Sequence, residues 1–422
     1  MRTTIITALK ALILLWLPLA TFAATPANVM LHTADRAVVD STGARVLLRC
    51  VNLSPWLVPE GYLISPGSLA ALTTSPSQIK QRLETVVGPE RAAAFWRYWT
   101  NAFVNETDFR HLKSAGFNCV RLPVDANFIV RQIKAGGVTF VPDMIAPVDR
   151  AVAWSAATGI YVILDLHDAP GGQNPISTVS DVPSTDHIPR LWQGPSAAAN
   201  QRKTIALWRT LAARYAHAGS IGGYDLLNEP ALPSGVASNA LATLYGEIIK
   251  AVRTVDPHHM IVIEGNNYAH DFSTLQVLSD SNILYEFHEY AIGNRAWRSP
   301  SESALAPFLR LRRATGKPLW LGEFGENTAV WQEQVVDLLK AHGVGWAIWP
   351  WKRVDFGTSH PVIEAIEAPH SWRALAGYLV GRWLVRKPTP ADAEQAMAEM
   401  LVAIRTTNCR RDQALEKVLA DE

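Results

Sequence analysis

The amino-acid sequence predicts an α/β fold, a (β/α)8 TIM barrel. Eight short apolar runs alternate along the chain with longer amphipathic stretches, which is typical of parallel strands joined by helices. The runs are mostly continuous rather than alternating, as expected for strands buried on both faces. Eight such strands close a barrel. The expected strands span residues 46–52, 118–123, 160–167, 223–228, 260–264, 283–288, 318–323 and 344–349.

Two insertions interrupt the regular repeat of strand and helix. Residues 54–104 follow the first strand and include helical stretches, and residues 168–200 form a long loop after the third, rich in Gly, Pro, Ser and Asp. Both follow strands at the end of the barrel where α/β barrels place their active sites, so we expect them to wall a cleft there. Helices are expected over residues 77–87, 90–100, 203–218, 239–255 and 330–342.

The first 23 residues have the pattern of an export signal. Arg2 and Lys10 accompany the apolar stretch 11–20, and small residues precede the expected cleavage point after Ala23. The stretch is shorter than the ~20 apolar residues that span a bilayer, so we expect a secreted protein with no stable membrane insertion once the signal is cleaved. Residues 24–422 are expected to form one catalytic domain, with a barrel core over 44–385 and a helical extension over 388–422.

Charge and composition narrow the class of partner. The chain has 39 basic and 38 acidic residues without long runs of either sign, so we expect no nucleic-acid partner. Its 15 tryptophans favour a carbohydrate, because an aromatic face stacks on the apolar face of a sugar ring. We expect a monomer that acts on a β-linked oligo- or polysaccharide.

The three cysteines match no metal or haem spacing, and no other motif predicts a metal or a cofactor. Cys50 and Cys119 fall on neighbouring strands. We expect two buried free thiols there, and a disulfide bridge is the alternative.

Two glutamates end predicted strands and are the candidate catalytic residues. Glu229 follows Asn228 in the sequence Asn-Glu-Pro after the fourth strand, and Glu323 ends the seventh. Hydrolysis of a glycosidic bond needs a carboxylic acid that protonates the leaving oxygen, with its pKa raised by its surroundings, and an ionised carboxylate that attacks. We expect Glu229 to be the acid/base and Glu323 the nucleophile. Glu326 lies in the following loop and is treated as a bystander.

These motifs, and others at the remaining strand ends, resemble those of glycoside hydrolase family 5, the cellulase-type clan of retaining (β/α)8 hydrolases. The resemblance covers roughly residues 44–355. It implies that Arg121 braces the nucleophile, His167 binds sugar beside the cleavage point, and Trp349 forms the floor under the sugar. The full set that it implies is Arg121, His167, Asn228, Glu229, His288, Tyr290, Glu323 and Trp349. Trp351 and Lys352 are further candidates for substrate contacts.

For the substrate, we favour a β-glucan cleaved in the manner of an endo-β-1,4-glucanase. The alternatives are an exo-β-1,3-glucanase, a β-glucosidase, a glycosylceramidase-like enzyme, a β-mannanase, or an inactive carbohydrate-binding barrel. The insertion at 54–104 could block one end of the cleft, which would favour exo cleavage.

Overall fold

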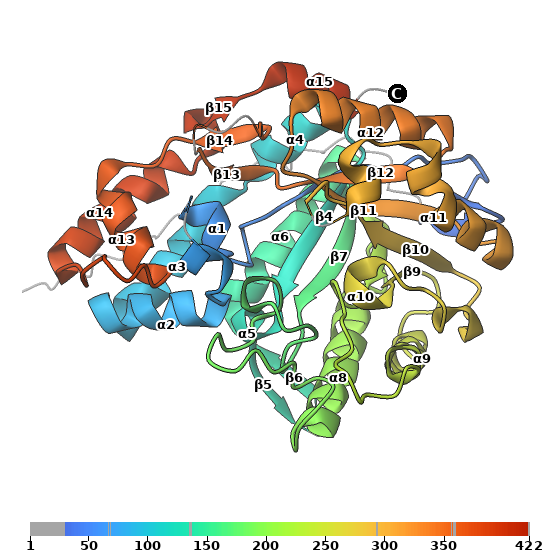
Figure 1. The fold of residues 1–422 in the computed structure, drawn as a ribbon, viewed down its shortest axis with the longest axis horizontal. Helices are drawn as coiled ribbons and strands as arrows, with labels where there is room; N and C mark the ends of the chain where they lie inside the picture. The colour runs from blue at the N-terminus through green and yellow to red at the C-terminus, as the bar shows by residue number, and fades with distance from the viewer. Residues whose placement is uncertain are drawn as a thin grey trace, which may run out of the picture.

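The computed structural model describes residues 30–420, apart from positions 66, 68, 135–136, 293, 356 and 358–359; the predicted export signal lies outside the described residues. Its centre is a closed barrel of eight parallel strands (Figure 1). The predicted (β/α)8 barrel is therefore confirmed. In ring order the strands are β3 (Arg49–Asn52), β4 (Cys119–Asp125), β7 (Tyr161–Asp168), β8 (Ile221–Asp225), β9 (Met260–Glu264), β10 (Ile283–His288), β11 (Leu319–Gly325) and β12 (Gly345–Trp349).

Helices cover the outside of the barrel, but their alternation with the strands is incomplete. In the described part of the chain, β9 is followed only by the short segments α10 (Asn266–Ala269) and η2 (Leu275–Val277). The last helix position is filled from the C-terminal tail: α15 (Gln413–Ala420) packs on α4, α12 and β3, and the Leu419 carbonyl accepts a hydrogen bond from Trp346 Nε1. The connecting helices are α4 (Glu106–Ala115), α6 (Pro142–Thr158), α8 (Ala197–Tyr215), α9 (Ala240–Arg253), α11 (Glu302–Thr315) and α12 (Ala329–Ala341).

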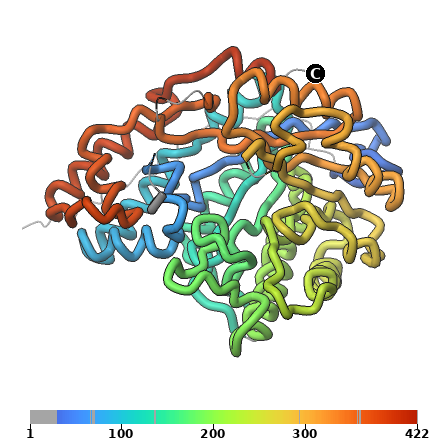
Figure 2. Tube along the Cα trace, viewed as in Figure 1, coloured from blue at the N-terminus to red at the C-terminus, as the bar shows by residue number. Residues whose placement is uncertain are grey.

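The first insertion packs against the C-terminal part of the chain. It contains α1 (Gly61–Ile64), η1 (Leu69–Leu72), α2 (Pro76–Val87) and α3 (Pro89–Phe103). Ser75 starts α2 through a capping box with Gln78, and Pro76 occupies the first turn. Figure 2 shows α2 and α3 beside α13 (His370–Leu379) and α14 (Pro390–Ala403), where the rings of Trp99 and Trp372 stack. Together, α2, α3, α13 and α14 form a helical layer beside the barrel, on the same side as α1 (Figure 1).

Shorter elements complete the fold. The hairpin of β1 (His32–Ala34) and β2 (Ala37–Val39) covers the N-terminal end of the barrel, where Leu31 and Val38 pack on its interior. A small sheet joins the segment after β12 to the tail through β13 (Lys352–Val354), β14 (Glu364–Ile366) and β15 (Arg410–Arg411). The others are α5 (Ala126–Ile129), β5 (Val130–Lys134), β6 (Gly137–Phe140), α7 (Ser177–Ser180), η3 (Arg295–Arg298) and η4 (Thr406–Asn408).

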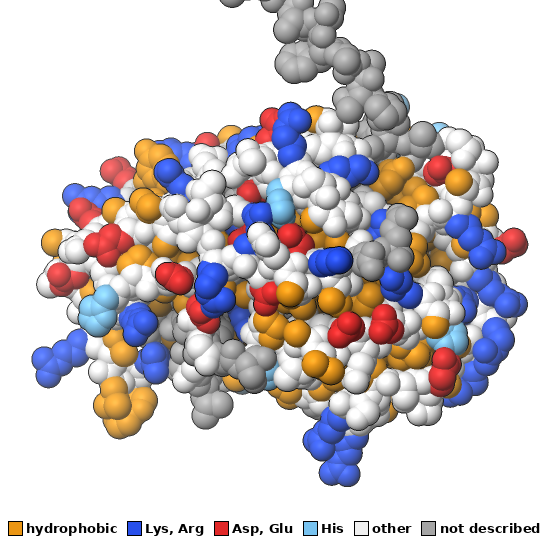
Figure 3. All heavy atoms as spheres, turned by 90° about the horizontal axis from the view of Figure 1, so that it is seen from above, with side chains coloured by type: hydrophobic (Ala, Val, Ile, Leu, Met, Phe, Trp, Pro, Cys, Tyr) orange, Lys and Arg blue, Asp and Glu red, His pale blue; other side chains and the backbone are white. Residues whose placement is uncertain are grey.

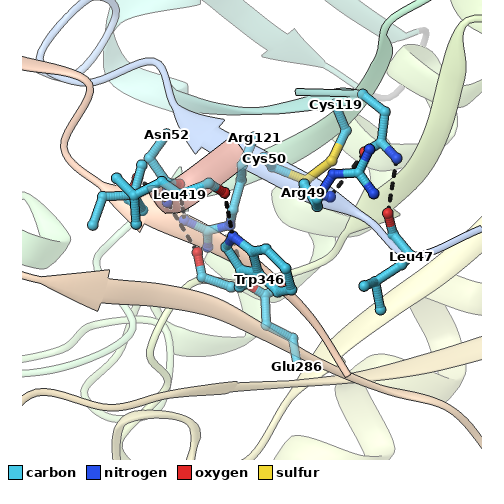
Figure 4. The surroundings of a disulfide bond; sticks show 12 residues. Leu47, Arg49, Cys50, Asn52, Cys119, Arg121, Glu286, Trp346 and Leu419 are labelled. Atoms are coloured by element: carbon cyan, nitrogen blue, oxygen red, sulfur yellow. Dashed lines mark hydrogen bonds and ion pairs between the residues drawn. A yellow bond between two sulfur atoms is a disulfide. The ribbon is translucent and has the colours of Figure 1, made fainter. Parts of the chain in front are cut away.

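Cys50 and Cys119 form a disulfide, so the expectation of two free thiols is wrong (Figure 4). The two residues are direct register partners on the adjacent parallel strands β3 and β4, with their Cα atoms 4.5 Å apart. That separation lies within the range that a disulfide spans. The pair is fully buried in the barrel interior among apolar side chains. Cys409 keeps a free thiol.

The surface is mixed in charge on the face drawn in Figure 3, where basic and acidic side chains are interspersed. Among the described residues, no helix combines the length and apolar character needed to cross a bilayer.

Candidate active site

The two candidate catalytic carboxyl groups lie close together at the C-terminal end of the barrel. Glu229 follows β8, Glu323 belongs to β11, and His288 ends β10 between them. One side-chain nitrogen or oxygen atom from each of these three residues lies within 4.8 Å of the other two. The two candidate glutamates therefore lie together although 94 residues separate them in the chain.

Arg121 occupies the middle of the site. Its buried guanidinium Nη1 donates to Glu323 Oε1 at 2.7 Å, and Nη2 donates to Asn228 Oδ1 at 2.9 Å. The expected contact between Arg121 and the Glu323 carboxylate is present. Four more buried carboxyl groups lie within 3.1 Å of the same guanidinium, namely those of Asp165, Asp225, Glu264 and Glu286.

The backbone at Glu229 is strained and held by neighbours. Its φ is +44°, a left-handed conformation that costs a residue with a side chain on the order of 1–3 kcal/mol. Its N–H donates to Glu264 Oε2 at 2.7 Å, and its carbonyl accepts from Asn174 Nδ2 at 2.9 Å. This turn places Glu229 Oε1 2.9 Å from His288 Nδ1. Burial raises the pKa of Glu229, as expected for a group that must hold a proton.

The Glu323 carboxylate is fixed through both oxygens. Arg121 donates to Oε1, and the Tyr290 hydroxyl donates to Oε2 at 2.8 Å. Tyr290 therefore contacts the candidate nucleophile directly. The Glu323 side chain is 5% exposed, so little water competes for these hydrogen bonds.

His167 and Trp349 form one wall of the site. Their rings stack with centroids 5.3 Å apart and planes 3° from parallel, and Trp349 Nε1 donates to the Tyr62 hydroxyl at 2.8 Å. His167 Nδ1 lies 2.8 Å from Asp165 Oδ2. Burial alone would lower the pKa of His167, but the carboxyl groups of Asp165 and Glu60 raise it well above its usual value. Tyr62 comes from the insertion after β3, which therefore does line the site.

Several buried polar atoms around this wall have no hydrogen-bond partner. They include Glu60 Oε2, His167 Nε2 and Asn228 Nδ2. Glu60 Oε1 and His167 Nε2 are 3.9 Å apart, and burial raises the pKa of Glu60 to about 7. Buried polar groups are normally paired in native structures, so unpaired ones mark places where a ligand can supply the partner.

Several charged side chains of the site are not recognisable as such from the sequence pattern. The pattern assigns Asp165, Asp225, Glu264 and Glu286 only to apolar strands. Their position could have marked them as members of a buried charge network. Each is a charged residue inside a strand that is buried on both faces, and charges are almost never fully buried unless they are paired. In the loop after β7, Gln173 Nε2 donates to the carbonyls of His167 and Asn228 and ties two strand ends together.

Of the two further candidates for substrate contacts, Lys352 points elsewhere. Trp351 and Lys352 are fully buried, and Lys352 Nζ donates to Thr406 Oγ1 and the Ile404 carbonyl in the C-terminal tail. Lys352 therefore joins the tail to the barrel. Glu326, expected to be a bystander, is a buried charged residue with a partner of its own. Burial raises its pKa to about 7, and its Oε1 lies 3.7 Å from Arg353 Nη1.

Two groups of side chains have the spacing of metal ligands in the part of the chain that the structure describes. One comprises Glu229, His288 and Glu323, and the other Glu264, Glu286 and His288. Arg121 already places a fixed positive charge against Glu323, Glu264 and Glu286, which weakens the case for a metal ion. The expectation of no metal stays a prediction.

Known proteins resemble the chain in both sequence and fold. The family model described as "Cellulase (glycosyl hydrolase family 5)" matches residues 79–355. A β-xylosidase of Phanerodontia chrysosporium is 30% identical over 77% of this chain and 71% of its own length. A probable glucan 1,3-β-glucosidase A of Emericella nidulans is 29% identical over 71% of this chain and 72% of its own length. An endoglucanase C of Acetivibrio thermocellus is 25% identical over 61% of this chain and 86% of its own length.

Among solved structures, a β-glucanase of Saccharophagus degradans aligns with a TM-score of 0.52 at 17% identity and covers 89% of this chain and 93% of its own. At that identity the likeness shows the fold alone. The family model, in contrast, spans more than half of the chain and includes every candidate site residue. The chain therefore belongs to glycosyl hydrolase family 5 and is an O-glycosyl hydrolase.

Proposed function

We propose that the protein is a retaining β-glycosidase in which Glu229 is the acid/base and Glu323 the nucleophile. The observation that carries this proposal is the pair of carboxyl oxygens within 4.8 Å of each other, in different surroundings. Retaining enzymes hold their carboxyl groups about 5–5.5 Å apart, whereas inverting enzymes need roughly 6.5–9.5 Å to admit a water molecule.

The reaction then takes two displacements. In the first, Glu323 attacks the anomeric carbon while Glu229 gives its proton to the departing glycosidic oxygen, which leaves a glycosyl ester on Glu323. In the second, the Glu229 carboxylate takes a proton from water as the water oxygen bonds to the anomeric carbon and the ester bond breaks. Glu229 regains its proton and Glu323 is freed as a carboxylate.

The remaining side chains of the site bind the sugar and orient the two catalytic carboxyl groups. Arg121 and Tyr290 hold Glu323 in position for attack. The unpaired Nδ2 of Asn228 can donate to a sugar 2-hydroxyl, and the unpaired Nε2 of His167 can bond a neighbouring hydroxyl. Trp349, supported by His167, contributes an aromatic surface for the sugar ring.

For the substrate we propose a β-glucan or β-glucoside cleaved at its terminal sugar. Glu60 and Tyr62 reach His167 and Trp349, and the side chains of Glu60, His167 and Trp349 are only 1%, 1% and 2% exposed. A cleft continuing past this corner would leave them open to solvent, so this burial supports a site that ends beside the cleavage point. The relatives named as a β-xylosidase and a glucan 1,3-β-glucosidase add support.

An endo-β-1,4-glucanase, which the sequence alone favours, is the second candidate, supported by the relative named endoglucanase C. Laminarin, lichenan, carboxymethyl-cellulose and cello-oligosaccharides separate the two. Terminal cleavage releases only monosaccharide from the start and hardly changes viscosity, whereas early oligosaccharides with a rapid fall in viscosity would establish endo cleavage.

The reaction class itself is tested with aryl β-glucosides and β-xylosides. Release of the aryl group by the wild-type protein, and its loss in Glu323→Gln, is the expected result. Proton NMR of the first sugar formed should show the β-anomer; the α-anomer would contradict retention. We also propose export of a mature chain of residues 24–422 that works as one domain, which N-terminal sequencing of the secreted protein checks.

A further inference from the structure

His288 has a carboxyl group at each of its two ring nitrogens. Nδ1 lies 2.9 Å from Glu229 Oε1 and 3.6 Å from Glu323 Oε2. On the other side, Nε2 lies 3.1 Å from Glu286 Oε1 and 3.5 Å from Glu264 Oε1. Which nitrogen carries the hydrogen decides whether Glu229 meets a donor or an acceptor.

The two oxygens that face Nε2 both lie against the Arg121 guanidinium. Glu264 Oε1 accepts from Arg121 Nη2 at 3.0 Å, and Glu286 Oε1 forms an ion pair with Arg121 Nε at 3.0 Å, while the Nε hydrogen itself is donated to Asp225 Oδ2. A proton on either oxygen would lie against this fixed positive charge. Nε2 therefore faces two acceptors and must itself carry a hydrogen.

His288 has only one such hydrogen. Its ring is 1% exposed, and burial lowers its pKa to about 3, so the ring is neutral. With the hydrogen on Nε2, Nδ1 presents a lone pair to Glu229 Oε1. The short contact between them is then a hydrogen bond only if Glu229 is the donor.

We propose that Glu286 and Glu264 are positioning residues that fix His288 as the Nε2–H tautomer and so keep Glu229 in its protonated, acid form. This proposal rests on the proposed role of Glu229 as acid/base. Arg121 then acts on both catalytic carboxyl groups: it pairs directly with Glu323, and it acts on Glu229 through the two glutamates and His288. The logic is that of a buried carboxylate selecting the tautomer of a catalytic imidazole.

The two positioning residues hold different numbers of protons. Both oxygens of Glu264 accept from N–H groups, of Arg121 and of the Glu229 backbone, which is the arrangement of an ionised carboxylate even though burial raises its pKa. Glu286 instead faces the Asp225 carboxyl group, and burial raises the pKa of Glu286 well above the usual value. Glu286 Oε2 and Asp225 Oδ1 are both buried without a hydrogen-bond partner, and a proton that Glu286 shares with Asp225 would satisfy both atoms.

The surroundings of Glu286 support this assignment. The titratable groups that face it come from five neighbouring positions in the barrel: Arg121, Asp165, Asp225, Glu264 and His288. One guanidinium cannot neutralise all of these carboxyl groups, so at least one must keep its proton. Gly322 makes room for the Glu286 side chain, because a Cβ at that position would lie 1.5 Å from Glu286 Oε1.

The tautomer can be read without any substrate. In ¹⁵N-histidine NMR spectra of the wild-type protein near pH 7, the His288 signals should show a protonated Nε2 and an unprotonated Nδ1; His288→Gln identifies them by their loss. A protonated Nδ1 in the wild type would overturn the proposal. Because this measurement needs no turnover, it stands even if aryl glycosides are not hydrolysed and the proposed function fails.

Two substitutions of one residue separate tautomer control from packing. Glu286→Gln reproduces the proposed pattern, since its carbonyl accepts from His288 beside the Arg121 guanidinium while its amide donates to Asp225. It should keep the tautomer and the position of the basic limb of the kcat/KM profile. Glu286→Leu removes the nearer of the two acceptors and leaves only Glu264 Oε1, at 3.5 Å from Nε2. The hydrogen then moves to Nδ1 and donates to the Glu229 carboxylate, which lowers the pKa of Glu229.

For Glu286→Leu, the basic limb should therefore move to lower pH. We expect kcat/KM to fall about tenfold to a hundredfold on substrates with poor leaving groups, and less than about fivefold on activated aryl glycosides. Two outcomes would overturn the proposal. One is a switch of the His288 tautomer in Glu286→Gln. The other is a folded Glu286→Leu variant in which both the tautomer and the basic limb stay unchanged. If Glu286→Leu fails to fold, the wild-type spectrum and Glu286→Gln still decide the question.

Discussion

The two ends of the barrel interior differ sharply in chemistry. At the N-terminal end, inward side chains are apolar or form the disulfide: they include Leu48, Cys50, Cys119, Ile163, Met260, Val262, Leu284, Trp320 and Ala347. Two residues further along the same strands, the inward positions become polar or charged. Cys119 is followed by Arg121, Val262 by Glu264, and Leu284 by Glu286. The change occurs within two residues, or about 7 Å, along each strand.

This difference indicates that the C-terminal end of the barrel carries the chemistry and the N-terminal end supports it. Buried carboxyl groups repel one another and would spread apart in a pliable structure, so they need a rigid support. The apolar layer, the disulfide and the covering β1–β2 hairpin supply that support directly below them. We therefore expect substitutions at the C-terminal end to change the reaction rate, and substitutions at the N-terminal end to change stability.

The largest effect is expected for Glu323→Gln. Loss of the nucleophile should lower kcat on aryl β-glucosides by about 10⁴-fold or more. Urea unfolding should show equal or greater stability, since the change removes one of several crowded carboxyl groups around Arg121. A loss of activity smaller than tenfold would exclude Glu323 as the nucleophile.

Glu229→Ala should lower kcat/KM by about 10²- to 10⁴-fold on substrates with poor leaving groups, and much less on activated aryl glycosides, which need little protonation to depart. Burial raises the pKa of Glu229, so the wild-type rate should fall as the pH rises through that pKa. The variant should lose this basic limb. If Glu229 and Glu323 variants show the opposite leaving-group dependence, their roles are reversed.

Arg121→Met tests the boundary between the two ends, because it should affect both rate and stability. Removing the guanidinium leaves buried carboxyl groups uncompensated, which should cost about 3–5 kcal/mol in the free energy of unfolding. Burial raises the pKa of Asp225 to about 7, and a group with a raised folded-state pKa stabilises the fold at low pH and loses that contribution as pH rises.

The destabilisation by Arg121→Met should therefore be smaller at pH 5 than at pH 8 in urea unfolding. Arg121→Lys keeps the charge but loses the planar fork, and should be intermediate. Equal destabilisation at both pH values would mean that the neighbouring carboxyl groups do not share protons as inferred.

The sequence predicted that Glu229 and Glu323 lie together, because its pattern puts each of them near the C-terminal end of a buried strand and these ends meet in a parallel barrel. Strand position alone was enough to bring Glu229, Glu323 and Arg121 together. It failed for Lys352, which lies beyond the end of β12 and bonds Thr406 in the tail. Side-chain direction outside a strand depends on packing partners that are distant in the sequence.

The disulfide and the carboxyl cluster were missed for related reasons. The sequence places Cys50 and Cys119 on adjacent strands, but only the register makes them direct partners. Glu264 and Glu286 sit in runs that are otherwise apolar, and a strand pattern that counts apolar residues treats them as exceptions. Their meaning depends on one guanidinium, supplied by a third strand.

The smallest expected effect, and the sharpest test of the division between the two ends, is removal of the disulfide by Cys50→Ala with Cys119→Ala. The bridge closes a loop of 69 residues, and its loss should cost about 2–4 kcal/mol in urea unfolding. The rate should change less than about threefold, because the surrounding apolar layer still supports Arg121 from below. A tenfold loss of kcat with unchanged stability would show that the disulfide positions Arg121 itself, and that the two ends do not work separately.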